Sequence, residues 1–350
     1  MKPIESTSNA VKLALLGTMG GTHIGGGLAR GAAKLGIKSI LFDAEQAEAG
    51  PRLLRSLSWH LADRRPLHLN RSSNGLVDTC ARARPDIIIA TGMAPLTGSA
   101  LRALRQLNIL SVNYSTDDPW NPAMRSNWHL RALPLYDLIF SPRRSNIEDF
   151  RRLGCGKVHH LSFGYDECLF AGATYSSDVC AHDVLFVGGA DHDRVAFMTE
   201  FVGRGLPVAV VGGYWERYPD FRVQALGIKP PEMIRALTAA AKVNLCLVRR
   251  ANRDGHVMRS FEIAAAGGCM LAEDTEEHRE LFGPEGEATI YFGNAREAAE
   301  RARALLCNPS ERKRLAATLH RRIVGGAHTY TDRLATILGI AGGKQGYANV

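Results

Sequence analysis

The chain has 350 residues, of which 45% are hydrophobic and 22% charged, and its formal net charge is +8. This length exceeds one ordinary core and predicts two domains, and the composition is that of a soluble globular protein, not a disordered one. The basic balance permits anionic partners such as nucleotides or lipid surfaces without selecting among them. No apolar run approaches the roughly 20 residues that span a bilayer, and the N-terminus lacks a signal-peptide pattern, so a cytoplasmic protein is expected.

Two segments, 12–43 and 183–213, share one pattern of apolar strand, glycine-rich turn, amphipathic helix and second apolar strand. Each is the opening of a βαβ unit, because buried parallel strands read as continuous apolar runs. Further strands are expected at 86–90, 109–114, 136–141, 157–162, 241–248, 268–273 and 288–292. Residues 294–308 and 309–324 have the composition and period of helices.

The repeated opening predicts an α/β protein with two doubly wound, Rossmann-like domains. The first is expected over residues 1–165 and the second over 183–325. Residues 166–182 are polar and without period, which indicates a linker. Residues 326–350 are expected to form a C-terminal helix and tail that pack back on the first domain.

The first glycine-rich turn, residues 17–31, fits neither the P-loop nor the dinucleotide-binding spacing. Its glycines exceed what one turn needs, and glycine lets a backbone approach a ligand closely. Gly20, Gly21, Thr22 and His23 are therefore candidate binding residues. The alternative is a tight turn in which His23 is an ordinary first-turn residue.

The stretch NYSTDDPWNP follows a buried strand, so Asp117 and Asp118 are expected at its carboxyl end, where ligands bind in such sheets. Either aspartate is a candidate polar group of the site. The alternative is local, because aspartate before proline is typical of turns and of helix caps.

The stretch ADHDR contains a D-x-D pair, Asp191 and Asp193. Such a pair directly after an apolar strand holds a divalent metal in one class of glycosyltransferases. Gly188 and Gly189 separate it from the strand here, and a helix begins at once, so capping by aspartate is the favoured interpretation. The seven cysteines are scattered and form no CxxC pair, which speaks against a zinc site.

In the second domain, Asp254 and Glu262 stand eight positions apart around the start of a predicted short helix that ends at the pair Gly267–Gly268. Asp254 is expected in the loop before the helix, and Glu262 about two turns inside it. A helix N-terminus at the carboxyl edge of a sheet favours phosphate, and a carboxylate further along can accept from a ribose diol. The arginines available to a phosphate are Arg249, Arg250, Arg253 and Arg259. The alternative is an acidic helix flank and a surface Arg259–Glu262 pair.

The segment DGHVMRSFEIAAAGGCMLAED resembles the E-x7-E region of the retaining GT-B glycosyltransferases of family 4, with Asp254-Gly255 and Glu262 in the motif positions. Together with DVLFVGGADHDR and the segment 276–306, it resembles most closely the CgeB-like spore-maturation glycosyltransferases. The resemblance implies a GT-B fold with a cleft between the domains. It departs from the family where Asp254 replaces the usual glutamate.

By this resemblance Glu262 binds the ribose, Arg259 or Arg250 the diphosphate and Arg194 the donor phosphate. In the loop after the second strand of this domain, Tyr214 or Trp215 stacks on the base. The other donor contacts implied are Gly189, Gly255, His256, Gly20, Gly21 and Thr22. The residues expected at the reacting sugar and the acceptor are Asp254, His23, Asp117 and Asp118.

The expected function is transfer of a sugar from a nucleoside diphosphate sugar, UDP-sugar before others, with retention and without metal or other cofactor. One alternative is a catalytically silent nucleotide- or sugar-binding protein, and another is a metal-dependent glycosyltransferase that uses Asp191 and Asp193. The acceptor, whether glycan, lipid, protein or small molecule, is not identified. The dispersed basic residues predict no nucleic-acid partner and leave peripheral membrane contact open.

Overall fold

The computed structural model describes residues 11–170, 181–221 and 224–343. These form two compact units, the first of described residues 11–161 and 333–343 and the second of described residues 162–170, 181–221 and 224–332. Helix α14 (Tyr330–Gly342) begins in the second unit and contributes its remaining residues to the first. Among the residues described, no helix is both long and apolar enough to cross a membrane.

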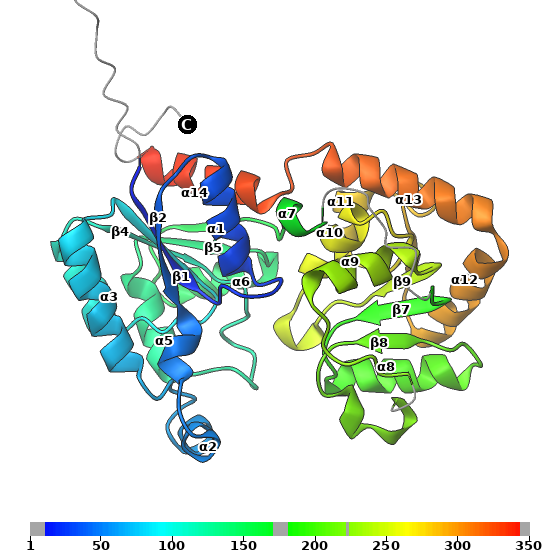
Figure 1. Cartoon of the computed structure of the whole chain (residues 1–350), viewed down its shortest axis with the longest axis horizontal. Coiled ribbons are helices and arrows are strands. Elements are labelled where there is room, and N and C mark those ends of the chain that lie inside the picture. Colours follow the sequence, from blue (N-terminus) through cyan, green and yellow to red (C-terminus); the bar gives the residue numbers. More distant parts are fainter. Residues whose placement is uncertain (1–10, 171–180, 222–223, 344–350) are drawn as a thin grey trace, which may run out of the picture. The chain divides into compact units, whose positions relative to one another are not determined.

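The first unit is built on a six-stranded parallel sheet (Figure 1). The order of its strands is β2-β1-β3-β4-β5-β6. The strands are β1 (Leu13–Gly17), β2 (Ser39–Asp43), β3 (Ile87–Thr91), β4 (Leu110–Tyr114), β5 (Leu138–Ser141) and β6 (Val158–His160). The helices are α1 (Ile24–Lys34), α2 (Arg52–Leu61), α3 (Leu69–Ala83), α4 (Gly98–Gln106), α5 (Asn127–Ala132) and α6 (Arg144–Arg152), with 3-10 turns η1 (Ala44–Glu48) and η2 (Leu133–Leu135).

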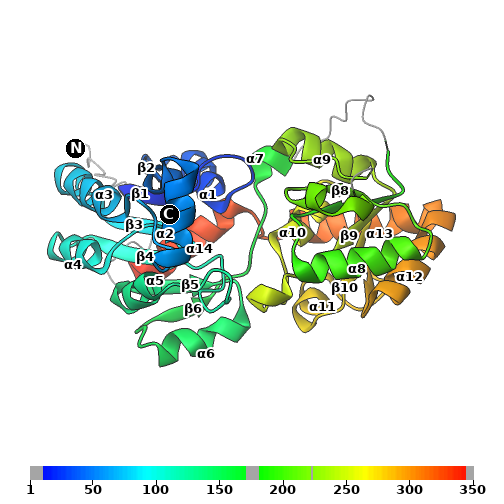
Figure 2. The same ribbon diagram turned by 90° about the horizontal axis from the view of Figure 1, so that it is seen from below.

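One core of this unit lies between the sheet and the helices α3, α4, α5 and α6 (Figure 2). Alternate side chains of the central strands, such as Leu16 and Ile88, point into it and are buried. Leu101 and Leu104, one turn apart on α4, close it from the helix side. The continuous apolar strands therefore form a sheet buried among helices, as the sequence predicts.

The second unit has a five-stranded parallel sheet in the order β11-β10-β9-β7-β8. Its strands are β7 (Val184–Val187), β8 (Ala209–Val211), β9 (Val243–Cys246), β10 (Met270–Glu273) and β11 (Ile290–Phe292). Its helices are α7 (Glu167–Phe170), α8 (His192–Gly203), α9 (Pro231–Ala240), α10 (Met258–Ala265), α11 (Glu276–Phe282), α12 (Ala295–Cys307) and α13 (Pro309–Val324), with 3-10 turns η3 (Trp215–Arg217), η4 (Pro219–Phe221) and η5 (Arg250–Asn252).

Helices α8 and α12 pack on each other over one core of this unit, while α10 packs against α9 and α13 (Figure 2). Trp215 is fully buried in the first of these cores, with the rings of Phe186 and Phe221 at 6.0 and 5.0 Å between centroids. Asn308 caps α13 by accepting from the Glu311 backbone N–H, and Pro309 opens the helix, where a missing N–H costs nothing.

The expectation of two doubly wound parallel sheets is confirmed. The short helix α7 lies inside the stretch predicted as a linker, where Asp166 is buried and accepts from the Cys168 N–H. The rest of that stretch, residues 171–180, lies outside the described residues.

In both sheets the first strand lies between the second and the third, since β1 has β2 and β3 as neighbours and β7 has β8 and β9. The connection after the first strand therefore leads to one side of it, and the connection after the third strand leads to the other side. In open α/β sheets ligands bind at the carboxyl ends of the strands beside such a switch point. A ligand is therefore expected at the loops after β7 and β9 in the second unit, and at the loops after β1 and β3 in the first.

Candidate functional site

The loop after β7 is held by backbone and tryptophan hydrogen bonds. The Gly188 N–H donates to the Val211 carbonyl, and the Ala190 N–H to the Gly213 carbonyl, at 2.8 and 3.0 Å. The indole N–H of Trp215 donates to the Gly188 carbonyl at 2.7 Å. Gly189 between them has no atom closer than 3.6 Å to where a Cβ would stand. The loop is therefore held by its hydrogen bonds to residues 211–215, and space remains beside Gly189.

Helix α8 starts at this loop, with Asp191 as its cap. The Asp191 carboxylate accepts from the Arg194 backbone N–H at 3.0 Å, so the favoured capping interpretation is confirmed. The same carboxylate lies 3.6 Å from the Arg194 guanidinium and 3.9 Å from Arg249 Nε. Asp191 thus faces two guanidinium groups as well as the helix N-terminus.

Arg194 is largely buried, with 15% of its side chain exposed. Its guanidinium donates to the Gly189 carbonyl at 3.2 Å and lies over the Phe186 ring at 5.5 Å. Burial lowers its pKa, and the nearby carboxylates of Asp191 and Asp254 act in the opposite direction. This arrangement places a fixed cation beside Gly189.

The loop after β9 brings in the second part of the site. Asp254 lies in this loop, half-buried and ahead of α10, as predicted; its backbone N–H donates to the Arg249 carbonyl at 3.3 Å. Arg253, just before it, has a left-handed backbone with φ 54° and ends the turn η5. Asp254 is close enough to Arg194 to affect its pKa, so the two loops meet.

Glu262 lies in the second turn of α10, as predicted, and is 1% exposed. It forms an ion pair with Arg259, whose side chain is 16% exposed. Burial raises the pKa of Glu262 to about 7; the Arg259 charge lowers it and the Asp166 charge raises it. The interpretation of Arg259–Glu262 as a surface pair is therefore wrong, because the carboxylate is inside the fold.

Cys246, the last residue of β9, shows that these groups converge. Burial raises the pKa of its thiol, and the charges of Arg259 and Arg194 both act against that rise. The arginines of α8 and α10 therefore flank the carboxyl end of the same central strand. The switch point of the second sheet carries Arg194, Arg249 and Arg259 together with Asp191 and Asp254.

The prediction that His256 contacts the donor is corrected by the structure. His256 is 1% exposed, and its Nε2 accepts from the Phe163 backbone N–H at 3.0 Å. Its Nδ1 lies 2.5 Å from a carboxylate oxygen of Glu277. Since Nε2 accepts, the proton is on Nδ1 and points at Glu277. Both ring nitrogens have partners inside the second unit, so His256 stabilises the fold and does not contact a ligand.

Glycine is required at position 255 by the Glu277 carboxylate that pairs with His256. A Cβ at this position would lie 2.4 Å from the Glu277 carboxyl carbon. The Thr275 hydroxyl also donates to the Gly255 carbonyl. This glycine therefore allows the loop before α10 to pack on the start of α11.

Arg250, the other predicted phosphate contact, is engaged by a carboxylate. Its Nε and Nη2 donate to Glu273 at 3.1 and 2.8 Å, and Glu273 also accepts from the Val248 N–H. The pair borders a hollow of about 310 Å³, which Arg194 and Asn294 also line. Sequence analysis missed Glu273, although an acid at the end of a buried strand, here β10, was the available signal.

The aromatic pair after β8 divides into one buried and one exposed ring. Trp215 is core, which corrects the idea that it stacks on a ligand. Tyr214 is 54% exposed with a left-handed backbone at φ 74°, and the Arg217 guanidinium covers one ring face at 4.4 Å. Tyr214 is therefore the exposed ring of the pair.

In the first unit, part of the glycine excess after β1 serves packing. A Cβ at Gly25 or Gly26 would lie 2.7 and 2.3 Å from backbone carbonyl oxygens of the preceding loop. Gly20, Gly21 and His23 are exposed and Thr22 is half-exposed; His23 stands at the cap position of α1 but its side chain makes no capping bond. These candidates remain accessible at the first switch point.

The two aspartates after β4 differ. Asp118 is 1% exposed and accepts from the Trp120 N–H and the Asn146 amide, both at 2.9 Å. Its candidacy as a catalytic residue is therefore corrected to turn formation. Asp117 is half-buried, and one carboxylate oxygen would lie 3.0 Å from a Cβ at Gly92, which follows β3. Asp117 is thus the aspartate that lies beside the first switch point.

Over residues 11–170, 181–221 and 224–343, no group of three or more His, Cys, Asp or Glu side chains is arranged to hold a metal ion.

Residues 194–339 match the family model described as glycosyl transferase-like. This region begins at Arg194 and contains Asp254, Arg259 and Glu262. The match confirms the predicted class of protein, a glycosyltransferase, for most of the second unit. No curated protein sequence matches the chain.

Solved structures resemble the whole chain at low sequence identity. Sucrose-phosphate synthase from Thermosynechococcus elongatus is 14% identical with a TM-score of 0.70, covering 97% of this chain and 100% of that one. A Listeria monocytogenes protein assigned as UDP-N-acetylglucosamine 2-epimerase is 14% identical with a TM-score of 0.61, over 98% of each chain. Anabaena Alr3699/HepE, solved with UDP and glucose, is 15% identical with a TM-score of 0.63, over 95% of this chain and 100% of that one. These likenesses confirm the GT-B fold.

Proposed function

We propose that this protein transfers a sugar from a nucleoside diphosphate sugar, with UDP as the leaving nucleotide, to an acceptor bound by the first unit. The donor occupies the switch point of the second sheet. The proposal includes retention of the anomeric configuration, no need for a metal, and membership of the CgeB-like branch, for all of which the sequence resemblance is the support.

The observation that carries this proposal is the group of three arginines at the carboxyl end of β9. Arg194 and Arg249 lie at Asp191, the N-terminal cap of α8, and the charges of Arg194 and Arg259 both act on Cys246 at the end of β9. A diphosphate needs several fixed positive donors, and guanidinium groups with a helix N-terminus provide them. As the sugar leaves, the same groups stabilise the charge that grows on the nucleoside diphosphate.

Glu262 is assigned to the ribose. A buried carboxylate accepts well from a diol, provided that it is ionised when the donor binds. Arg259 favours that ionised form against the effect of burial. Asp254 lies in the loop before α10 and is assigned to hydroxyl groups of the transferred sugar.

The metal-dependent alternative requires Asp191 and Asp193 to share a cation. Asp191 already accepts from a backbone N–H and faces Arg194 and Arg249. Two guanidinium groups at this carboxylate oppose a divalent cation by charge. This favours the version of the reaction in which arginines replace the metal.

A second candidate function is epimerisation of a UDP-sugar, because the assigned Listeria epimerase shares the fold. The glycosyl transferase-like family match of residues 194–339 favours transfer. A catalytically silent binding protein is the third candidate, since Asp254 is shorter than the usual glutamate. Product analysis separates the three: transfer or slow hydrolysis releases UDP, epimerisation yields a new UDP-sugar, and a silent protein does neither.

The test is calorimetric titration of UDP, GDP and ADP into the full chain in EDTA, followed by nucleotide release from the matching hexose donors. Arg194→Gln is expected to weaken nucleotide binding about 10- to 100-fold, since a hydrogen bond to a charged group contributes roughly 1.5–3 kcal/mol. Arg204→Gln is the matched control, because Arg204 follows the other end of α8 and its guanidinium pairs with the exposed Glu200.

Equal affinities in the two variants would contradict the site. Binding that disappears in EDTA, returns with Mn²⁺ and is lost in Asp193→Asn would instead support the metal-dependent alternative.

A further inference from the structure

Helix α2 of the first unit is not buried on any side. Its ten residues, RLLRSLSWHL, include no buried one. Figure 1 shows it apart from the six-stranded sheet. Amphipathic helices in globular proteins normally bury their apolar stripe against a core, so this helix raises the question of what its apolar stripe contacts.

The apolar stripe consists of Leu53, Leu57 and Leu61, spaced four residues apart, with Leu54 beside them. Their exposed fractions are 71%, 46% and 80%, and that of Leu54 is 50%. No other element of the described residues carries as many exposed large apolar side chains. An exposed group of this kind, at helical spacing, indicates an interaction surface.

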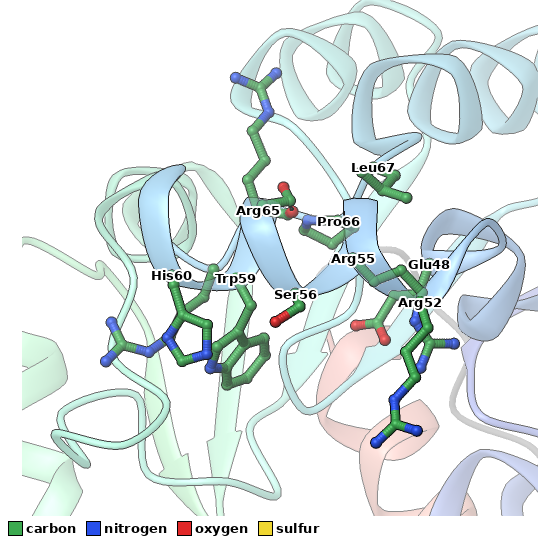
Figure 3. Close-up of a pocket in the computed structure, with 11 residues that line it drawn as sticks. Glu48, Arg52, Arg55, Ser56, Trp59, His60, Arg65, Pro66 and Leu67 are labelled. Carbon is green, nitrogen blue, oxygen red and sulfur yellow. Dashed lines mark hydrogen bonds between the residues drawn. The ribbon is translucent and has the colours of Figure 1, made fainter.

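The opposite side of α2 is basic. Figure 3 shows Arg52, Arg55, Trp59 and His60 on the helix, bordering an open hollow of about 270 Å³ with Arg65 on the returning segment. Arg64 also lines this hollow, and Glu48 is its one acid. Arg52 and Arg55 are exposed and form no ion pair with any described residue. The hollow therefore presents unneutralised guanidinium groups.

The helix is nevertheless anchored at its C-terminal end. Asp63 and Arg64 both have left-handed backbones, with φ 56° and 54°. The Asp63 carboxylate accepts from the backbone N–H groups of Asn127 and Trp128 at 2.7 and 3.0 Å. The Arg64 guanidinium donates to three carbonyls of residues 122–125. Two non-glycine residues hold a costly conformation here, so the exposed leucine stripe is a built feature of the unit.

We propose that α2 docks the first unit on an anionic lipid surface. A helix lying in a membrane interface buries its apolar side roughly 5–10 Å deep, and a helix is about 10 Å across. The leucine stripe therefore enters the acyl boundary while Arg52 and Arg55 on the opposite side stay at the level of the lipid phosphates. A second copy of the chain is the weaker occupant, because it brings the same basic charge.

The experiment is co-sedimentation of the full chain with vesicles of phosphatidylcholine alone or with added phosphatidylglycerol. Binding is expected only to the anionic vesicles and to weaken as salt is added. Leu57→Gln/Leu61→Gln is expected to weaken it by at least about tenfold, since each leucine loses its apolar burial while glutamine keeps the helix propensity. Arg52→Gln/Arg55→Gln is expected to weaken binding to anionic vesicles.

Ile228→Gln is the matched control, because Ile228 is 82% exposed and lies in the second unit. It should bind as the unchanged chain does. The assay needs no donor, so its outcome is independent of the proposed transfer.

Three results would overturn the proposal. Equal binding to neutral and anionic vesicles would remove the role of the arginines. Absence of vesicle binding, with a thermal shift by inorganic phosphate that Arg52→Gln/Arg55→Gln abolishes, would make the hollow a site for small anions. A dimer in sedimentation velocity that Leu57→Gln/Leu61→Gln dissociates, without vesicle binding, would assign the stripe to a second copy.

Discussion

Replacing Glu262 by glutamine tests the electrostatics of the donor site without any ligand. In the folded protein burial raises the pKa of Glu262 from 4.5 to about 7. The folded state therefore keeps this proton at pH values where the unfolded chain has released it. A group with a raised folded pKa stabilises fully below its unfolded pKa, and this stability is lost as pH rises through the folded pKa.

The size of the effect follows from the shift. One pKa unit corresponds to about 1.36 kcal/mol, so a rise from 4.5 to about 7 corresponds to about 3 kcal/mol in all. Most of this is lost between about pH 5 and pH 8, that is, roughly 2–3 kcal/mol of unfolding free energy. Glutamine has no proton to lose, so the Glu262→Gln variant lacks this dependence, whatever its absolute stability without a partner for Arg259.

The measurement is native-state hydrogen exchange of the α10 amides at the two pH values, corrected for the intrinsic exchange rate. It reports the opening free energy of this part of the chain and does not require the two units to unfold together. Glu232→Gln is the control, because Glu232 is exposed in the first turn of α9. The control should lose protection with rising pH as the unchanged chain does, while Glu262→Gln should lose about 2–3 kcal/mol less.

The same pH dependence in Glu262→Gln and the unchanged chain would refute this reasoning. If the site assignment holds, UDP affinity also follows the ionised fraction of Glu262. With a pKa of about 7, that fraction is about tenfold lower at pH 6 than at pH 8. Any dependence that persists in the variant belongs to the phosphate of the nucleotide, which titrates near pH 6.

Three further substitutions test the packing that holds the loops of the candidate site in place. Gly255→Ala places a Cβ 2.4 Å from the Glu277 carboxyl carbon and should destabilise the protein by about 1–3 kcal/mol in urea unfolding. Gly189→Ala, with no atom within 3.5 Å of the new carbon, should be near neutral in the same assay, and equal losses would contradict the packing argument. Trp215→Phe replaces the buried indole by a smaller phenyl ring and leaves the Gly188 carbonyl without its indole donor. The unfilled volume and the lost bond together should cost roughly 2–4 kcal/mol in thermal unfolding, and an unchanged midpoint would contradict this reasoning.

The sequence by itself determined the elements that depend on neighbouring residues. Apolar runs and glycine turns predict the two parallel sheets, because strands and turns depend on residues that are close together in sequence. The cap at Asp191 and the helix end at Gly267–Gly268 were predicted for the same reason: both are bonds within one turn. The positions of Asp254 before α10 and Glu262 within it follow from that helix.

Tertiary structure alone decided which polar side chains are available to a ligand. His256 is used by the Phe163 N–H, 93 residues away in sequence, and Asp118 by Asn146, 28 residues away. Glu262 is buried by elements that lie far from α10 in sequence. This burial raises the pKa of its carboxyl group to about 7, although the i, i+3 spacing to Arg259 is that of an ordinary surface pair. Whether a side chain can reach a ligand, and what its pKa is, depend on every residue that packs around it. Spacing along the chain shows only the neighbours on the same helix, strand or loop.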